Sequence, residues 1–345
     1  MGKAAIFNPY LDTLGGGERY TIFFAKVLAE EGYVVDIEWK DNSIKEKIQN
    51  RFGIKLSENI NFVDDIKRGE NYDVCFWISD GSIPTLRART NFLHFQVPFK
   101  DVNGKTLLNK MKLFRINKII CNSNFTKKVI DKEYGVNSLV IYPPVDILSI
   151  KPKRKENTIS YVGRFSSLVQ SKGHEILIDV FKNLIKEKGF VDWKLILAGG
   201  IEVGVGNYLN RLKILSKNIN IEFVESPNFN ELKEIYGKSK FFWSAAGFGV
   251  NEINSPEKVE HFGISLIESM AAGCVPVVYN AGGYKEIITS GENGFLWQNK
   301  KDLIRFTEKV TKTSGLYKKV STQAKKTSLK YSYEFFKNNV CQILK

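Results

Sequence analysis

The chain has 345 residues, of which 43% are hydrophobic and 26% charged, and its net charge is +14. This length exceeds one ordinary hydrophobic core, so two domains are expected. The sequence lacks a run of eighteen apolar residues and a basic start followed by an apolar stretch, which argues against a membrane-spanning helix and a secretory signal. Four scattered cysteines without a CxxC pair predict buried free thiols and a reducing, cytoplasmic location.

Strand-like and helix-like segments alternate along the first half of the chain. A helical period over residues 18–32 follows the first apolar run. Strands are predicted at 3–10, 33–39, 72–79, 89–96, 118–123 and 138–144. Such a series is typical of a mostly parallel sheet with helices on both faces.

Two prolines and a charged stretch predict a linker over residues 142–158, after which the alternation restarts. Strands are predicted at 158–165, 193–200, 221–226, 240–246 and 275–280, with helices at 173–189, 207–218, 230–239, 263–273 and 284–288. We therefore predict an α/β protein with two Rossmann-like domains, 1–150 and 151–330, that face each other across a deep cleft. Whether a last helix within 331–345 completes the first domain is left open.

Three glycines at 15–17 end the first predicted strand and open the first helix. A glycine-rich loop at a helix N-terminus exposes backbone N–H groups, and the helix dipole favours an anion there. The spacing is not GxGxxG, so NAD binding has little support, and a simple tight turn is the alternative.

Two cations, Arg164 and Lys172, flank a loop after the strand that opens the second domain. An arginine fork and a lysine point charge can converge on one diphosphate. The alternative is two separate surface charges.

The segment "EKVEHFGISLIESMAAGCVPVV", residues 257–278, holds two glutamates around a predicted helix start. The N–H groups of the first turn would be open to phosphate oxygens; they belong to Phe262, Gly263, Ile264, Ser265 and Leu266. Glu260 precedes this turn and Glu268 lies a turn or two into the helix, so an anion cradle with a carboxylate on each side suits a nucleotide sugar. An ordinary amphipathic helix entering a buried strand is the alternative.

Five segments resemble, in order, the motifs of the retaining glycosyltransferases of family four, which have the GT-B fold. They are "GGGERY", "YVGRFSSLVQSKG", "IYPPVD", "EHFGISLIESMAAGCVPVV" and "NAGGYKEIITSGENGFLW". Glu260 and Glu268 correspond to the family's E-x7-E motif. The first and fourth segments look most similar to the branch that adds mannose to lipid-linked oligosaccharides.

The resemblance implies a catalytic set of four residues. Arg164 and Lys172 would bind the donor diphosphate and stabilise it as it leaves, and Glu260 would bind hydroxyl groups of the donor sugar. His94 matches a histidine near the reacting sugar, although a lone histidine in an apolar strand is commonly a core residue.

The resemblance also implies donor-binding roles outside this set. Glu268 would hold the ribose, and Gly16 and Gly17 would approach the phosphates from the other domain. The implied reaction is front-face displacement with retention and without a metal, since the chain has no Asp-x-Asp motif. The predicted donor is GDP-mannose, with UDP-glucose or UDP-N-acetylglucosamine second, and the predicted acceptor is a glycan or a lipid-linked glycan. No other cofactor is expected.

Positive charge is concentrated in two runs. Residues 100–132 carry nine Lys and Arg against two Asp, and residues 300–330 carry ten against one Asp and one Glu. These runs predict attraction to a polyanion, such as the cytoplasmic face of an anionic membrane, unless they are simply solvated helix faces. Nucleic acid is a weaker expectation, because no nucleic-acid-binding motif is present.

Two other functions remain open at the level of sequence. One is a sugar-nucleotide epimerase of similar fold, and the other is a non-catalytic protein that binds a sugar nucleotide or polyanion. The sequence does not determine the oligomeric state.

Overall fold

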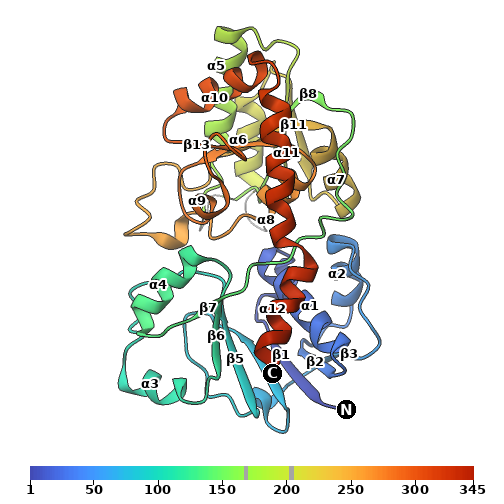
Figure 1. The fold of residues 1–345 in the computed structure, drawn as a ribbon, viewed down its shortest axis with the longest axis vertical. Coiled ribbons are helices and arrows are strands. Elements are labelled where there is room, and N and C mark those ends of the chain that lie inside the picture. The colour runs from blue at the N-terminus through green and yellow to red at the C-terminus, as the bar shows by residue number, and fades with distance from the viewer. Residues whose placement is uncertain (167–169, 202–205) are drawn as a thin grey trace. The chain divides into compact units, whose positions relative to one another are not determined.

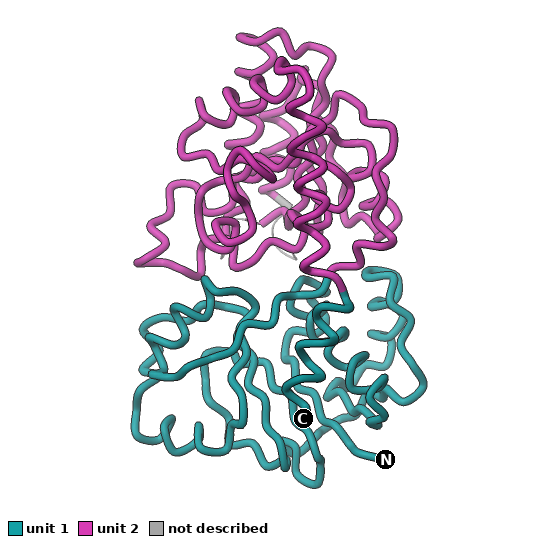
Figure 2. The backbone as a smooth tube through the Cα atoms, viewed as in Figure 1, with its two compact units in different colours: residues 1–144, 333–345 teal, residues 145–332 magenta. Residues whose placement is uncertain are grey.

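The computed structural model describes residues 1–166, 170–201 and 206–345. The chain forms two compact units, residues 1–144 with 333–345, and residues 145–332 (Figure 2). Each unit has its own parallel sheet.

The first unit is built on a seven-stranded parallel sheet in the order β3-β2-β1-β4-β5-β6-β7 (Figure 1). The strands are β1 (Lys3–Phe7), β2 (Val34–Glu38), β3 (Ile60–Val63), β4 (Val74–Ile78), β5 (Thr90–Phe95), β6 (Lys118–Cys121) and β7 (Leu139–Val140). The predicted strand 138–144 is correct only for two residues, because the prolines at 143 and 144 have no N–H to donate to a neighbouring strand. The short strand β3 was not among the predicted elements.

The helices of the first unit are α1 (Gly16–Glu30), α2 (Ile44–Phe52), α3 (Leu107–Leu113), α4 (Asn124–Tyr134) and α12 (Tyr333–Leu344). Helix α12 packs on α1. The ring of Phe336 lies edge-on to the ring of Tyr20 with the ring centroids 5.1 Å apart, and Lys337 Nζ forms an ion pair with Glu30 Oε2 at 2.8 Å. The C-terminal helix therefore belongs to the core of the first unit, although more than 180 residues of the second unit separate it from β7.

The second unit has a six-stranded parallel sheet in the order β10-β9-β8-β11-β12-β13. Its strands are β8 (Glu156–Val162), β9 (Lys194–Gly199), β10 (Ile221–Glu225), β11 (Ser239–Ser244), β12 (Val275–Tyr279) and β13 (Phe295–Trp297). Its helices are α5 (His174–Lys188), α6 (Gly206–Leu215), α7 (Phe229–Lys238), α8 (Ile264–Ala271), α9 (Tyr284–Ile287), α10 (Lys300–Lys312) and α11 (Leu316–Ser328). Four short 3-10 turns complete the described elements: Leu11–Thr13, Lys67–Gly69, Pro256–Lys258 and Leu329–Tyr331.

The strand order reverses direction next to β1 in the first unit and next to β8 in the second. In open parallel sheets such a reversal leaves a crevice at the carboxyl ends of the strands, where ligands bind. The two parallel sheets confirm the predicted fold class of two Rossmann-like α/β domains. Among the helices of the described residues, none has both the length and the hydropathy needed to cross a membrane.

Candidate functional site

Glu260 and Lys172, which stand 88 positions apart in the sequence, form the centre of the candidate site. Lys172 Nζ donates to Glu260 Oε2 at 2.9 Å, and the two side chains are only 12% and 18% exposed. Lys172 follows β8 and Glu260 follows β11, and these strands are neighbours in the sheet. The pairing therefore arises because adjacent parallel strands end at the same edge.

The two loops that carry this pair are also tied together by Gln170. Lys172 Nζ donates to Gln170 Oε1 at 2.5 Å, and Gln170 Nε2 donates to the carbonyl oxygen of Val259. Gly173, at the end of the first loop, has φ +66°, and a Cβ there would lie 2.7 Å from the Cβ of Ala245. Glycine thus lets the start of α5 approach the loop that leads to Glu260.

The carboxylate of Glu260 is held in its charged form. Burial raises its pKa, but the neighbouring positive charges of Lys172, His261 and Arg164 outweigh burial, so the pKa lies below its usual value. Arg164 is itself largely exposed at the end of β8. The structure thus brings Arg164, Lys172 and Glu260 into one electrostatic group. The predicted contact of the two cations with a diphosphate stays a prediction, and part of the loop between them, residues 167–169, lies outside the described residues.

The first turn of α8 begins directly after this group. Gly263 caps the helix with φ +110° and ψ +63°, a conformation that residues with a Cβ rarely adopt. A Cβ at this position would also lie 2.6 Å from Cε1 of Tyr284. The N–H groups of Ile264, Ser265 and Leu266 belong to the first turn, where no acceptor within the helix is available, so they can bind an anion.

Glu268 lies one turn further along α8 and is only 4% exposed. Its Oε2 accepts a hydrogen bond from the hydroxyl of Tyr236, on α7, at 3.1 Å. Phe262, before the helix, is buried with its ring edge-on to Tyr331 at 5.4 Å. The ribose-binding role of Glu268 stays a prediction, and Tyr236 is a partner that sequence spacing could not reveal.

A second loop, which carries Gly282 and Gly283, packs against the backbone carbonyl group of Glu260. The N–H of Gly283 donates to the carbonyl oxygen of Glu260 at 2.8 Å, and a Cβ on Gly282 would lie 2.1 Å from the same oxygen. Glu252 accepts from the N–H of Gly282 at 2.8 Å and from Lys285. Gly282 and Gly283 belong to the fifth motif, "NAGGYKEIITSGENGFLW", but no role in the site was predicted for them from the sequence. Their pairing was the available signal, since paired glycines commonly mark a close backbone approach.

The remaining predicted site residues, Gly16, Gly17 and His94, belong to the first unit. Gly16 begins α1, and a Cβ on Gly17 would lie 1.7 Å from Oε1 of Gln96, so the side chain of Gln96 occupies the space next to this glycine. The predicted contact of these glycines with phosphate stays a prediction.

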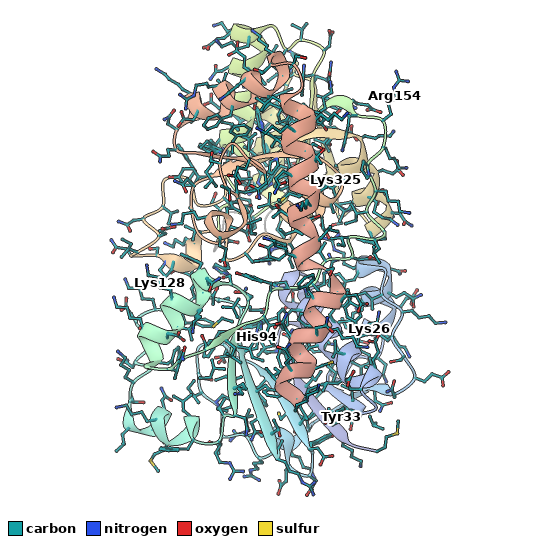
Figure 3. The ribbon with its side chains drawn as sticks, viewed as in Figure 1. Lys26, Tyr33, His94, Lys128, Arg154 and Lys325 are labelled. Carbon is teal, nitrogen blue, oxygen red and sulfur yellow. The ribbon has the colours of Figure 1, made fainter. Side chains whose placement is uncertain are left out.

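His94, labelled in Figure 3, lies in β5 and is 0% exposed. Its ring stacks on that of Tyr20 with ring centroids 4.1 Å apart. Neither of its ring nitrogens has a hydrogen-bond partner among the described residues. Burial lowers its pKa to about 3, so the ring is neutral at physiological pH. A buried polar ring without partners is unusual and is compatible with either a core residue or one that meets a ligand.

The four cysteines are free thiols: Cys75, Cys121 and Cys274 are buried as predicted, whereas Cys341 is only partly buried. Among the described residues, no three His, Cys, Asp or Glu side chains come together in a way that could hold a metal ion. The positive charge of the candidate site comes from Arg164, Lys172 and the α8 amides.

The site and fold define a protein with two Rossmann-like units whose second unit carries a cationic and carboxylate group at a helix N-terminus. A family model described as "Glycosyl transferases group 1" matches residues 147–327, more than half of the chain. The chain therefore belongs to the group 1 glycosyl transferases.

Individual relatives agree with this assignment. A GDP-Man:Man(3)GlcNAc(2)-PP-Dol alpha-1,2-mannosyltransferase of Dictyostelium discoideum is 24% identical over 240 residues, which cover 64% of this chain and 45% of that protein. A glycosyltransferase of Rickettsia africae has a TM-score of 0.76 at 20% identity, covering 100% of this chain and 99% of the other. HepE of Anabaena, crystallised with UDP and glucose, has a TM-score of 0.76 at 17% identity with the same coverage. The two structures show a shared fold, and the chain matches less than half of the length of the Dictyostelium protein.

Proposed function

We propose that this protein is a retaining glycosyltransferase that transfers a hexose, mannose as the first choice, from a nucleoside-diphosphate sugar to a glycan or lipid-linked acceptor. The observation that carries the proposal is the Lys172–Glu260 pair, 2.9 Å apart, beside the open first turn of α8. It combines a place for a diphosphate with a carboxylate that can accept hydrogen bonds from sugar hydroxyls.

Lys172 would offer an N–H donor to the diphosphate. An ammonium group has three N–H bonds, and the described residues accept two of them, through Gln170 Oε1 and Glu260 Oε2. The third N–H, together with Arg164 and the amides of α8, would neutralise the diphosphate in the ground state and more strongly as it departs.

The proposed reaction needs little further chemistry from the protein. The bond between the anomeric carbon and the phosphate oxygen breaks, and its electron pair goes to the departing diphosphate. The acceptor hydroxyl oxygen forms the new bond on the same face of the carbon, and its proton passes to a diphosphate oxygen. Catalysis then rests on positioning and on stabilisation of the leaving charge by Arg164 and Lys172, without a metal ion.

The names of two relatives support the donor choice. The Dictyostelium relative is named for GDP-Man, which favours GDP-mannose, and the Anabaena structure contains UDP and glucose, which keeps UDP sugars as the second choice. The name of the Dictyostelium relative also includes a lipid-linked acceptor, PP-Dol. This supports the proposal that the acceptor of the present protein is borne by a membrane, and hence that the protein makes peripheral contact with the cytoplasmic face of that membrane.

The roles proposed for Gly16, Gly17 and His94 complete this function. Backbone N–H groups at the start of α1 would bind phosphate oxygens. The neutral ring of His94 would exchange a hydrogen bond with a sugar hydroxyl, since neither nitrogen is bonded to a described residue.

A thermal-shift screen against GDP-mannose, UDP-glucose, UDP-N-acetylglucosamine, GDP and UDP tests the donor site, because a ligand that binds only the folded state raises the melting temperature. Lys172→Ala should lose the shift. Lys300→Ala is the matched control, since it breaks an ion pair of 2.7 Å with Asp179 whose two side chains are 42% and 48% exposed.

The outcomes separate the candidate functions. Sugar transfer to an added acceptor supports the proposal. Conversion of the donor without an acceptor would indicate an epimerase, and donor binding without any turnover would indicate a non-catalytic binding protein. Equal shifts in wild type and Lys172→Ala would contradict the assigned site.

A further inference from the structure

Helix α3 exposes large apolar side chains to solvent. Leu107, Leu108 and Met111 are 76%, 61% and 61% exposed, and no residue of α3 is buried. Phe114, which follows α3 as its C-cap in a helical backbone conformation, is 91% exposed. Figure 1 shows α3 at the periphery of the first unit. Isolated exposed apolar residues are common, but four within eight positions form a patch, and such patches mark interaction surfaces.

The apolar side chains share one face of the helix. Leu107, Met111 and Phe114 follow the i, i+4, i+7 spacing that aligns residues on a helix, and Leu108 lies beside them. We call these four residues the α3 stripe. Leu113 lies away from the stripe and packs partly buried against the core around Phe95, so the helix is anchored by one side and presents the other.

The stripe lies in a segment that carries only positive charge. Between residues 102 and 130 the chain has seven Lys and Arg and no Asp or Glu. Lys105, Lys110 and Arg115 are exposed around the stripe, and Lys112 is partly exposed. An apolar stripe bordered by cations is the composition of a helix that lies in the interface of an anionic bilayer.

The loop before α3 is held by a defined set of hydrogen bonds. The carboxylate of Glu133, on α4, accepts from the backbone N–H groups of Asp101, Val102 and Gly104 at 3.1, 3.1 and 3.2 Å. Thr106 caps the helix by accepting from the N–H of Asn109 at 3.3 Å. The α3 stripe is thus presented by an ordered support.

We propose that α3 is the element through which this protein contacts an anionic lipid surface, with the α3 stripe inserted at the boundary between headgroups and acyl chains. Lys105, Lys110, Lys112 and Arg115 contact the anionic headgroups. A second copy of the chain is a poorer occupant, since two surfaces with the same net positive charge would repel each other. The inference rests on the proposed function for one point, the lipid-borne acceptor that membrane contact would bring within reach.

The test is flotation of the purified full chain with vesicles of phosphatidylcholine alone or with about a third phosphatidylglycerol. Wild type should float with the anionic vesicles at low salt and much less with the neutral ones. The triple variant Leu107→Ser, Met111→Ser, Phe114→Ser should lower the partition constant by roughly tenfold or more, because it removes the inserted apolar surface. The variant Lys110→Glu, Lys112→Glu, Arg115→Glu should abolish anionic binding.

A matched control replaces two exposed apolar residues of the second unit, Val191→Ser and Ile214→Ser, which are 66% and 75% exposed. It should float like wild type. Equal flotation of the α3 triple variant and wild type, or no flotation of wild type, would overturn the inference. So would a dimer in size-exclusion chromatography that the triple variant converts to a monomer without any change in flotation.

Donor binding separates this inference from the proposed function. The α3 triple variant should keep the wild-type thermal shift with the nucleoside-diphosphate sugar, and its transfer to a soluble acceptor should be unchanged. Donor binding without vesicle binding refutes α3 as the contact element and leaves the proposed function standing. Vesicle binding without donor binding refutes the proposed function alone.

Discussion

Replacing Lys172 by methionine tests how the candidate site is held together. The change keeps most of the side-chain volume and removes the charge that lies 2.9 Å from Glu260. Breaking a fully buried ion pair costs roughly 3–5 kcal/mol, because the remaining charge is left buried. Glu260 is 18% exposed and keeps the charge of Arg164 nearby, so we expect a loss of about 2 kcal/mol in the free energy of unfolding at pH 7.5.

The loss should depend on pH in a defined direction. In the wild type the pKa of Glu260 lies below its usual value of about 4.3, so its stabilising effect is present above that pH and disappears as the pH falls through the lowered pKa. In the variant, burial is no longer opposed by Lys172, and the pKa of Glu260 rises. The stability difference between the two proteins should therefore shrink toward zero as the carboxyl becomes protonated in both.

Urea unfolding of four proteins measures this effect: wild type, Lys172→Met, Glu260→Gln and the double variant. Since a neutral glutamine no longer needs a cation, the double variant should be more stable than the sum of the single losses predicts, by at least about 1 kcal/mol. Donor affinity, measured in parallel by calorimetry, should fall at least about tenfold in Lys172→Met. Additive losses, or a loss that stays constant between pH 7.5 and 4, would refute the reasoning.

Four further predictions concern the surroundings of this pair and the reaction. Gly263→Ala should lower stability by about 2–4 kcal/mol, because its φ of +110° disfavours a Cβ that would also clash with Tyr284, and thermal unfolding checks this. Glu252→Ala should cost about 1 kcal/mol by removing the acceptor of the Gly282 N–H, and should lower kcat with little change in donor affinity; a wild-type kcat would show that the loop is held without it. His94→Gln should lower kcat. The pH dependence of the wild-type rate should show no ionisation near pH 6.5 that belongs to His94, since burial lowers its pKa to about 3. An ionisation near pH 6.5 that is present in the wild type and absent from the variant would contradict this. EDTA should leave the transfer rate unchanged, whereas a loss restored by a divalent cation would contradict the metal-independent reaction.

The sequence by itself determined the fold class and the chemistry of the second unit. Short apolar runs alternate with helical periods along the chain, and this local pattern is sufficient to predict parallel sheets. The motif residues Glu260 and Glu268, and the cations Arg164 and Lys172, could be chosen because their side-chain types limit what they can bind. The short strands β3 and β13 were not predicted, because four and three residues are too few to show a recognisable pattern.

Tertiary structure decided which of these residues meet. Lys172 and Glu260 are 88 positions apart, and only the adjacency of β8 and β11 brings them to 2.9 Å. The burial of His94, the docking of α12 on α1 and the exposure of the α3 stripe depend equally on what packs against each side chain. A sequence pattern reports the chemistry and local period of a segment, whereas the contacts of that segment with distant segments are fixed only when the whole chain packs. For this reason the positive charge around α3 was visible in the sequence, but the exposed apolar face of α3 was not.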